Sequence, residues 1–206
     1  MLSKNQFEVL NALRKAPGAS QRDVASVSLG TVNSTLKSLQ EEGLVEDGKP
    51  SASGMEGLAP YKVDNAVILA AGLSSRFAPI SYEKPKGVLK VRGEVLIERQ
   101  IEQLREAGIE DITVVVGYKK EYFFYLRKKY GVTLVNNDEY ASRNNNGSLW
   151  RVREHLGNTY VCSSDDYFTR NPFDAYVFKA YYSAQYAEGE TKEWCMETGV
   201  GGRITK

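Results

Sequence analysis

The chain has 206 residues, of which 42% are hydrophobic and 26% are charged, and its formal net charge is +1. This length leaves room for more than one domain, and the balanced charge excludes a global electrostatic attraction to nucleic acid or to a membrane. No apolar stretch is long enough to span a bilayer, and the two cysteines lack metal-ligand spacing, so we expect a cytoplasmic protein with reduced thiols.

The N-terminal region differs in pattern from the rest of the chain. Apolar residues at helical spacing predict a helix around residues 7–14. Ser20, with an acidic residue three positions later, is typical of the start of a second short helix. A third helix is predicted at residues 31–42, and the stretch 46–60 is rich in turn residues. This order resembles a winged helix-turn-helix, so we expect a small domain over residues 1–63.

The exposed face of the third predicted helix carries polar residues of the kinds that contact DNA, namely Asn33, Ser34, Lys37 and Ser38. Charge argues against strong binding, because DNA affinity rests largely on phosphate neutralisation. The seven basic residues of the region are Lys4, Arg14, Lys15, Arg22, Lys37, Lys49 and Lys62. Its seven acidic residues are Glu8, Asp23, Glu41, Glu42, Glu46, Asp47 and Glu56. We therefore expect weak non-specific DNA binding through residues 1–63, and a role in docking, dimerisation or sensing is an equal alternative.

The most informative segment is an apolar run at residues 66–70, which predicts a fully buried strand of a parallel sheet. The run leads into a loop of small residues at 71–75 that ends in Arg76. Small residues let backbone N–H groups approach a ligand closely, and together with an Arg fork they form an anion site suited to phosphates. A strand followed by such a loop is where α/β folds bind nucleotides. With Lys86 downstream, we predict a phosphate site here rather than an ordinary turn.

The remaining elements predict an α/β fold for residues 64–206. Further strands are predicted at residues 112–116, 132–135 and 160–163, and helices at 96–107, 121–130 and 148–156. Strands separated by helices imply right-handed crossovers and a mostly parallel, Rossmann-like sheet covered on both faces. Beyond Pro172 we expect a short helix, and then two strands of a mixed extension at 181–186 and 192–197.

These motifs resemble the sugar-phosphate nucleotidyltransferase family, which joins a nucleoside triphosphate to a phosphorylated small molecule. Within it, the chain is similar from about residue 65 to residue 206 to the bacterial CTP:phosphocholine cytidylyltransferases. The similarity rests on the Ala-Ala-Gly loop with its Ser-Arg, the Pro-Lys at 85–86, the Leu-Ile-Glu-x-Gln-Ile helix at 96–101, the Asn-Asn-x-x-Ser-Leu string at 144–149 and Glu193–Trp194.

The resemblance implies catalytic roles for two basic residues. Arg76 would clamp the triphosphate, which suits a permanently charged guanidinium that bonds phosphate oxygens in pairs. Lys86 would place a point charge between the α-phosphate and the incoming phosphate. Nucleotide binding is implied for eight residues of the loop and of the later Asn-rich segment: Ala70, Ala71, Gly72, Ser74, Ser75, Asn144, Asn146 and Ser148.

The Asn-rich segment is expected to contact the base. Amide and hydroxyl groups can read the donor and acceptor edge of cytosine, and Gly147 allows a close approach. A polar loop with a helix N-cap at Asn146 or Ser148 is an equal alternative.

Aromatic residues supply material for binding a quaternary ammonium group through cation–π contacts. Trp194 matches the family's Glu-Trp segment and is our candidate for the acceptor site, as one wall of a choline cage. Tyr181 and Tyr182 are weaker candidates, because aromatic residues more often belong to a core.

The predicted metal ligand is Asp165, at the end of the strand at 160–163, where α/β folds bind ligands. Carboxylates suit Mg²⁺, which usually takes one or two of them plus substrate phosphates. The role of Asp166 stays open. His155, the single histidine, is expected on a helix surface, so no side-chain general base is predicted.

The predicted function is transfer of CMP from CTP to phosphocholine, or to a similar small phosphorylated acceptor, with Mg²⁺ and release of pyrophosphate. The alternative acceptors are a sugar phosphate and an aminoalkyl phosphonate. A second alternative is a transcriptional regulator whose nucleotidyltransferase-like domain only senses a nucleotide or a choline-type ligand. Nothing in the sequence indicates an oligomeric state or a membrane partner. Relatives continue beyond the position of Thr205–Lys206, so we expect this domain to be incomplete at its C-terminus, with an open acceptor side.

Overall fold

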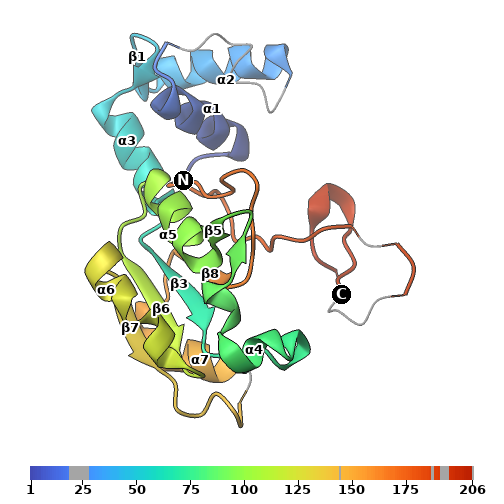
Figure 1. The fold of residues 1–206 in the computed structure, drawn as a ribbon. Helices are drawn as coiled ribbons and strands as arrows, with labels where there is room; N and C mark the ends of the chain where they lie inside the picture. The colour runs from blue at the N-terminus through green and yellow to red at the C-terminus, as the bar shows by residue number, and fades with distance from the viewer. Residues whose placement is uncertain (19–27, 144, 187, 191–194, 206) are drawn as a thin grey trace.

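The predicted parallel sheet is present. The computed structural model describes residues 1–18, 28–143, 145–186, 188–190 and 195–205. Its main sheet holds four strands in the order β7-β6-β3-β8, and every neighbouring pair is parallel. The strands are β3 (Asn65–Ala70), β6 (Ile112–Val116), β7 (Thr133–Asn136) and β8 (Thr159–Ser163), all within about one residue of the predicted bounds (Figure 1).

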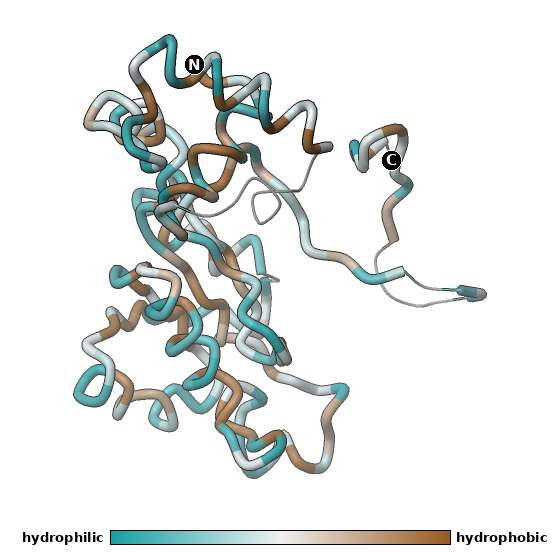
Figure 2. Tube along the Cα trace, turned by 90° about the horizontal axis from the view of Figure 1, so that it is seen from above, coloured by the Kyte–Doolittle hydropathy of each residue, from teal (hydrophilic) through white to brown (hydrophobic). Residues whose placement is uncertain are grey.

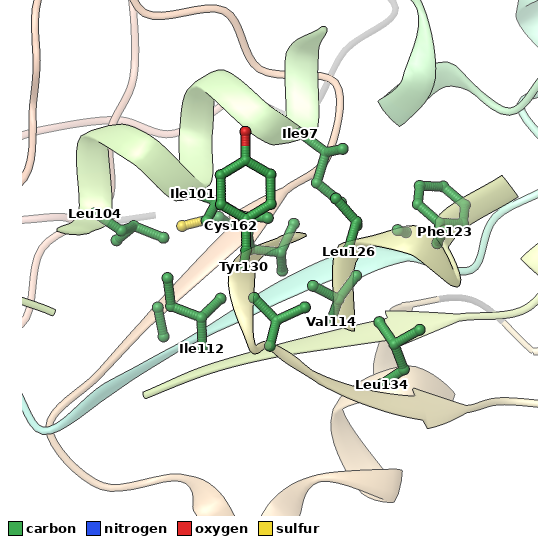
Figure 3. Close-up of a cluster of buried hydrophobic side chains, with 14 of the residues drawn as sticks. Ile97, Ile101, Leu104, Ile112, Val114, Phe123, Leu126, Tyr130, Leu134 and Cys162 are labelled. Carbon is green, nitrogen blue, oxygen red and sulfur yellow. The ribbon is translucent and has the colours of Figure 1, made fainter. Parts of the chain in front are cut away.

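The centre of the sheet is covered on both faces, as predicted, whereas Val161 of the edge strand β8 is 48% exposed. Alternate residues of β3 belong to different clusters: Ile68 packs with α5 (Leu96–Glu106) and α6 (Tyr125–Tyr130), whereas Val67 packs with Val152 on the other side. Figure 3 shows the first cluster, in which side chains of α5 and α6 meet over β6. Because neither face of β3 is left to solvent, its sequence is a continuous apolar run rather than an alternating one.

Two predicted helices differ in their bounds. The helix predicted at 121–130 divides into η4 (Lys120–Phe123) and α6, with Gly131 in the left-handed conformation after α6. The helix predicted at 148–156 begins earlier, as α7 (Asn145–Arg151), and continues as η5 (Arg153–His155). The short elements between β3 and α5 are η2 (Ser75–Phe77), α4 (Ile80–Glu83), η3 (Lys86–Val88), and a hairpin of β4 (Lys90–Val91) and β5 (Glu94–Val95).

The N-terminal part contains α1 (Lys4–Lys15), α2 (Leu29–Glu41), and an antiparallel pair of β1 (Val45–Glu46) and β2 (Lys49–Pro50). Ser3 and Gln6 form a capping box at α1. The turn-rich stretch 46–60 also holds α3 (Ala52–Leu58), which begins after Ser51 because the Ser51 hydroxyl accepts from the Gly54 N–H. It is followed by η1 (Ala59–Tyr61). The second helix, predicted from Ser20, lies outside the described residues.

Residues 173–178 connect the two hydrophobic cores. The Val63 N–H donates to Ala175 O at 2.8 Å, and the Val177 N–H donates to Tyr61 O at 2.8 Å. Phe173 and Val177 pack on the core of the sheet, while Phe178 stacks on Tyr61 at 5.5 Å in the N-terminal core. The short helix expected after Pro172 is therefore wrong, because the backbone of this segment pairs with residues 61–63 instead of with itself.

A charged contact supports the same junction. Asp174 forms an ion pair with Lys15 and a second one with Arg14, at 3.5 Å between Oδ1 and Nη2. Its other oxygen accepts from Asn11 Nδ2 at 3.4 Å. All three partners lie on α1, so this one carboxylate holds α1 against the sheet part of the chain. The domain boundary at residue 63 stays a prediction.

The segment after Phe178 leaves the body of the protein. Both views show residues 179–186 running outward, and η6 (Val200–Gly202) lies apart from the sheet (Figures 1 and 2). The strand expected at 181–186 is wrong, since this segment has no ladder partner among the described residues. Part of the strand expected at 192–197 lies outside the described residues. Tyr181, Tyr182 and Tyr186 are exposed.

Two further findings concern the expected environment. Over the described ranges, none of the helices combines the length and the apolar composition that a membrane crossing requires. Both cysteines are free thiols, and burial raises the pKa of Cys162 to about 12. The cytoplasmic location stays a prediction from the sequence.

Candidate active site

The order in which the chain adds strands to the sheet reverses between β3 and β8. The chain passes from β3 to β6 and β7 on one side, and β8 then lies on the opposite side of β3. In α/β sheets, ligands bind outside the carboxyl ends of the strands at the point where the strand order reverses. Leu69 of β3 is in register with Ser163 of β8, and the Ser164 N–H donates to Leu69 O at 3.1 Å. The predicted phosphate loop and the predicted metal ligand therefore leave the sheet side by side.

The loop after β3 has open space in front of its glycine. A Cβ added to Gly72 would meet no atom within 4 Å, and Gly72 does not have a left-handed φ. Neither packing nor backbone conformation therefore requires glycine at this position. Ser74 adopts the left-handed conformation before η2, which carries the exposed Arg76. A small residue facing open space is the arrangement that lets a ligand approach the backbone.

Lys86 lies against Asp165. Its Nζ is 2.9 Å from Asp165 Oδ2, and the Lys86 side chain is only 16% exposed. The neighbouring Gly87 permits this contact, because a Cβ there would lie 3.0 Å from Ser164 Cβ and 3.2 Å from the Phe123 ring. The glycine thus lets η3 approach the end of β8. Its signal in the sequence was its place directly after the Pro-Lys pair, which sequence reasoning did not use.

The same lysine also contacts the phosphate loop. Lys86 Nζ lies 4.5 Å from the centroid of the Phe77 ring, which follows Arg76 in η2. The structure therefore brings together three segments that the sequence had linked only by motif: η2, η3 and the end of β8.

Two carboxylates lie next to each other at the end of β8. Partial burial, and then the nearby charge of Asp165, raise the pKa of Asp166. Within the described residues, no group of three His, Cys, Asp or Glu side chains is arranged to hold a metal ion. Mg²⁺ commonly takes only one or two protein carboxylates and completes its shell with phosphates and water. The crowded pair Asp165–Asp166, whose repulsion a cation would relieve, fits a metal that binds together with a nucleotide.

The predicted base segment lies in and before α7, at the carboxyl end of β3 (Figure 1). Asn146 lines an open hollow of about 410 Å³ with Ser142, Arg143, Gly147 and Trp150. Trp150, which the sequence analysis did not name, lies four positions after Asn146 and is exposed beside this hollow. An exposed aromatic ring of this kind offers a surface on which a base can stack.

Ser148 is buried inside α7, and its Oγ accepts from Asn137 Nδ2 at 3.0 Å. The N-cap expected at Asn146 or Ser148 is therefore wrong, because the helix already begins at Asn145 and contains both residues. Contact of Ser148 with a base stays a prediction. Asn144 lies outside the described residues.

The acceptor candidates are less well placed. Trp194 lies outside the described residues. The Tyr181 hydroxyl donates to the Tyr160 hydroxyl at 3.3 Å, and its ring lies edge-on to that of Tyr160 on β8, with centroids 6.2 Å apart, while Tyr182 is 73% exposed. His155 is exposed on η5, as predicted for a surface position.

Comparisons with known proteins show which families the chain is similar to. The family model of the MobA-like NTP transferase domain matches residues 66–186, and that of the winged helix-turn-helix DNA-binding domain matches residues 2–46. Choline-phosphate cytidylyltransferase of Streptococcus pneumoniae is 47% identical over 134 residues, which are 65% of this chain and 58% of that protein. 2-Aminoethylphosphonate cytidylyltransferase of Lancefieldella rimae is 37% identical over 150 residues, 69% of this chain and 59% of that protein.

A solved structure is also similar. The structure of CTP:phosphocholine cytidylyltransferase from Streptococcus pneumoniae superposes with a TM-score of 0.53 and 50% identity, covering 54% of this chain and 49% of that one. The chain thus spans less than 60% of the length of the two curated relatives above.

Proposed function

Because the chain belongs to the MobA-like NTP transferase domain family, we propose that it transfers CMP from CTP to phosphocholine or a similar small phosphorylated acceptor. The family resemblance stated from the motifs is confirmed. The observation that carries the proposal is the contact of Lys86 with Asp165 beside the open phosphate loop. This contact places the Lys86 ammonium, which can bind phosphate, beside the Asp165 carboxylate, which can bind a metal. Both lie at the carboxyl ends of the strands, where α/β sheets bind nucleotides.

In the proposed reaction, a phosphate oxygen of the acceptor attacks the α-phosphorus of CTP in line. A new P–O bond forms, the bond between the α-phosphorus and the bridging oxygen to the β-phosphate breaks, and pyrophosphate leaves with that oxygen. A phosphomonoester has its second pKa near ~6, so the acceptor is already an anion at neutral pH and needs no general base. Positioning and charge neutralisation then supply most of the rate acceleration.

The chain's own residues have distinct parts in this scheme. Arg76 holds the triphosphate in two-point contacts, while Lys86 moves from Asp165 toward the α-phosphate and the incoming phosphate. The loop from Ala71 to Ser75 presents its backbone N–H groups to phosphate oxygens. Asp165, with Asp166 beside it, would hold Mg²⁺, which when bound neutralises charge on the triphosphate.

The acceptor and the base are the finer parts of the proposal. Support for cytidine comes from the Asn-rich segment, whose Asn146 lines the hollow before Trp150, and from the two cytidylyltransferase relatives. Phosphocholine, an aminoalkyl phosphonate and a sugar phosphate all present an anionic phosphorus group. A regulator that only senses its ligand would bind without turnover, and the presence of Arg76, Lys86 and Asp165 favours an enzyme.

We expect pyrophosphate release when the chain is supplied with CTP, Mg²⁺ and phosphocholine. In calorimetric titrations we expect CTP to bind at least about tenfold more tightly than ATP or GTP, because a tenfold difference is the effect of one well-made hydrogen bond. 2-Aminoethylphosphonate and a hexose 1-phosphate replace phosphocholine in parallel reactions. Equal or stronger purine binding would contradict the cytidine assignment, and binding without turnover on any acceptor would favour the sensor.

A second function is supported by the winged helix-turn-helix DNA-binding match at residues 2–46. We propose that residues 1–63 bind DNA only weakly without a specific sequence, because their basic and acidic residues cancel. Non-specific DNA binding commonly has Kd values of about 10⁻⁴–10⁻⁶ M at physiological salt. We expect binding at the weak end of this range, and therefore no mobility shift of random duplex DNA at micromolar protein. Strong, steeply salt-dependent binding would refute this expectation. Binding to one particular sequence would not.

A further inference from the structure

The loop that carries Asp165 and Asp166 is held by side chains of α5. Gln100 Nε2 donates to Ser163 O at 3.1 Å, Gln103 Nε2 donates to Phe168 O at 3.1 Å, and Arg99 Nε donates to Phe168 O at 2.9 Å. Arg99 and Gln103 are four residues apart, and Gln100 and Gln103 three, so all three reach the same side of the helix. Their acceptors lie on both sides of the two aspartates. We call these three residues the α5 clamp.

Gln100 donates to the carbonyl oxygen that also forms the turn containing Asp165, which we call the aspartate turn. Ser163 O also accepts from the Asp166 N–H at 3.3 Å, and the next N–H, that of Ser164, donates to Leu69 O. The peptide unit between Ser163 and Ser164 is therefore held by β3 on one side and by Gln100 on the other. This unit lies one residue before Asp165, so its position sets where the backbone that carries Asp165 leaves the sheet.

Arg99 holds the far side of the loop by two kinds of contact. Its guanidinium lies 4.9 Å from the centroid of the Tyr167 ring and also bonds to both oxygens of Glu94 at 2.7 and 2.8 Å. The Tyr167 hydroxyl donates to Glu94 as well, at 3.0 Å. Because Glu94 neutralises the guanidinium, Arg99 acts on the loop by geometry rather than as a charge competing for Asp165.

The two glutamines are costly residues for a helix that faces a core. Gln100 is 1% exposed and Gln103 is 7% exposed, and within the described ranges the Oε1 atom of each is buried without a hydrogen-bond partner. A buried polar atom without a partner lowers stability, so an apolar residue of similar volume would suit packing better. The two buried amides therefore indicate a role other than stability.

We propose that the α5 clamp, and Gln100 above all, is a set of positioning residues that orient the Asp165 carboxylate for Mg²⁺ bound with the nucleotide. The inference rests on the proposed function. Mg²⁺ demands near-ideal octahedral geometry, so a carboxylate on a loop without helix or strand must be held by its neighbours. Outer partners of this kind commonly change metal affinity or activity by about 10–100-fold when they are removed.

The test compares Gln100→Leu with the parent chain. We expect the thermal midpoint to change little, because removal of the unpartnered buried Oε1 offsets the loss of the Nε2 bond to Ser163 O, which keeps the Asp166 N–H as a donor. CTP affinity without metal stays unchanged, whereas the Mg²⁺ concentration that half-saturates CTP binding rises at least about tenfold. Hydrogen exchange at the amides of residues 164–169 speeds up in the metal-free protein. Gln103→Leu, read by the same measurements, replaces Gln100→Leu if that variant does not fold.

Arg105→Met is the matched control, since Arg105 lies on the same helix but contacts Tyr130 and Glu110. Its Mg²⁺ response stays that of the parent. An unchanged Mg²⁺ response in Gln100→Leu, with normal CTP binding by the parent, overturns the clamp while leaving the proposed function intact. A parent chain that binds no nucleotide overturns the proposed function, and the role of the clamp with it.

Discussion

Replacing Lys86 by Met should lower the rate of pyrophosphate release by about 10²–10³-fold, the usual effect of removing one donor that stabilises transition-state charge. The Lys86 side chain is 84% buried and points at Asp165, so solvent does not screen it as it would a surface lysine. CTP affinity should fall far less than the rate, because the charge is needed most where the two phosphates approach each other. Single-turnover kinetics and calorimetry on the same preparation measure the two effects.

Lys84→Met is the control for this experiment. Lys84 lies two residues earlier, on the exposed side of the same connection, and contributes nearly the same long-range charge. We expect its turnover to stay within about twofold of the parent, as for most surface substitutions. If both variants lose activity equally, the effect is one of general charge and the proposed role of Lys86 is wrong.

Asp165→Asn should abolish the dependence of CTP binding on Mg²⁺ and reduce turnover by about 10²-fold or more, because a neutral amide is a poor ligand for a hard dication. The substitution keeps the shape of the side chain, so the fold should persist. Titration of CTP binding against Mg²⁺ is the direct measurement. Asp138→Asn removes an exposed carboxylate that follows β7 and should leave the Mg²⁺ response unchanged.

His155→Ala tests the same mechanism from the other direction. His155 is exposed, and its backbone oxygen, which accepts from Asn65 Nδ2 at 2.9 Å, is kept in the variant. We expect turnover within about twofold of the parent. Should this substitution prove as damaging as Asp165→Asn, a reaction without a side-chain general base is refuted.

The main strands and the main helix could be predicted from the sequence because their signals are local. The apolar runs at β3 and β6 are bounded by polar and turn residues, and α5 repeats its apolar residues at 3.6-residue spacing before Gly108. The phosphate-loop motif and the Pro-Lys pair are also contiguous strings. Each of these features depends on neighbours within a few positions, so the chain alone was sufficient.

The elements that were predicted wrongly depend on distant partners. Residues 173–178 are extended because their backbone pairs with residues 61–63, more than 100 positions away in the chain. Ser148 lies inside α7, where its hydroxyl accepts from Asn137, eleven positions earlier and outside the helix. Helix and strand propensities depend on neighbouring residues and do not include such contacts. Burial and strand pairing in the folded chain therefore override them.

The sequence by itself determined the family, the four-stranded parallel sheet, and the identities of Arg76, Lys86 and Asp165 as candidate residues. Arg76 and Lys86 belong to contiguous motifs, and the strands and the place of Asp165 at the end of one of them follow from local apolar patterns. Only the tertiary structure decided that Lys86 Nζ lies 2.9 Å from an aspartate 79 positions away and that the aspartate turn closes against Gln100. The reason is geometric: the order β6-β3-β8 brings the two loops to the same edge of the sheet, and Gly87 leaves the room for η3 to approach the end of β8. A motif specifies which groups are present, but the distance between them is set by the packing of strands that the motif does not contain.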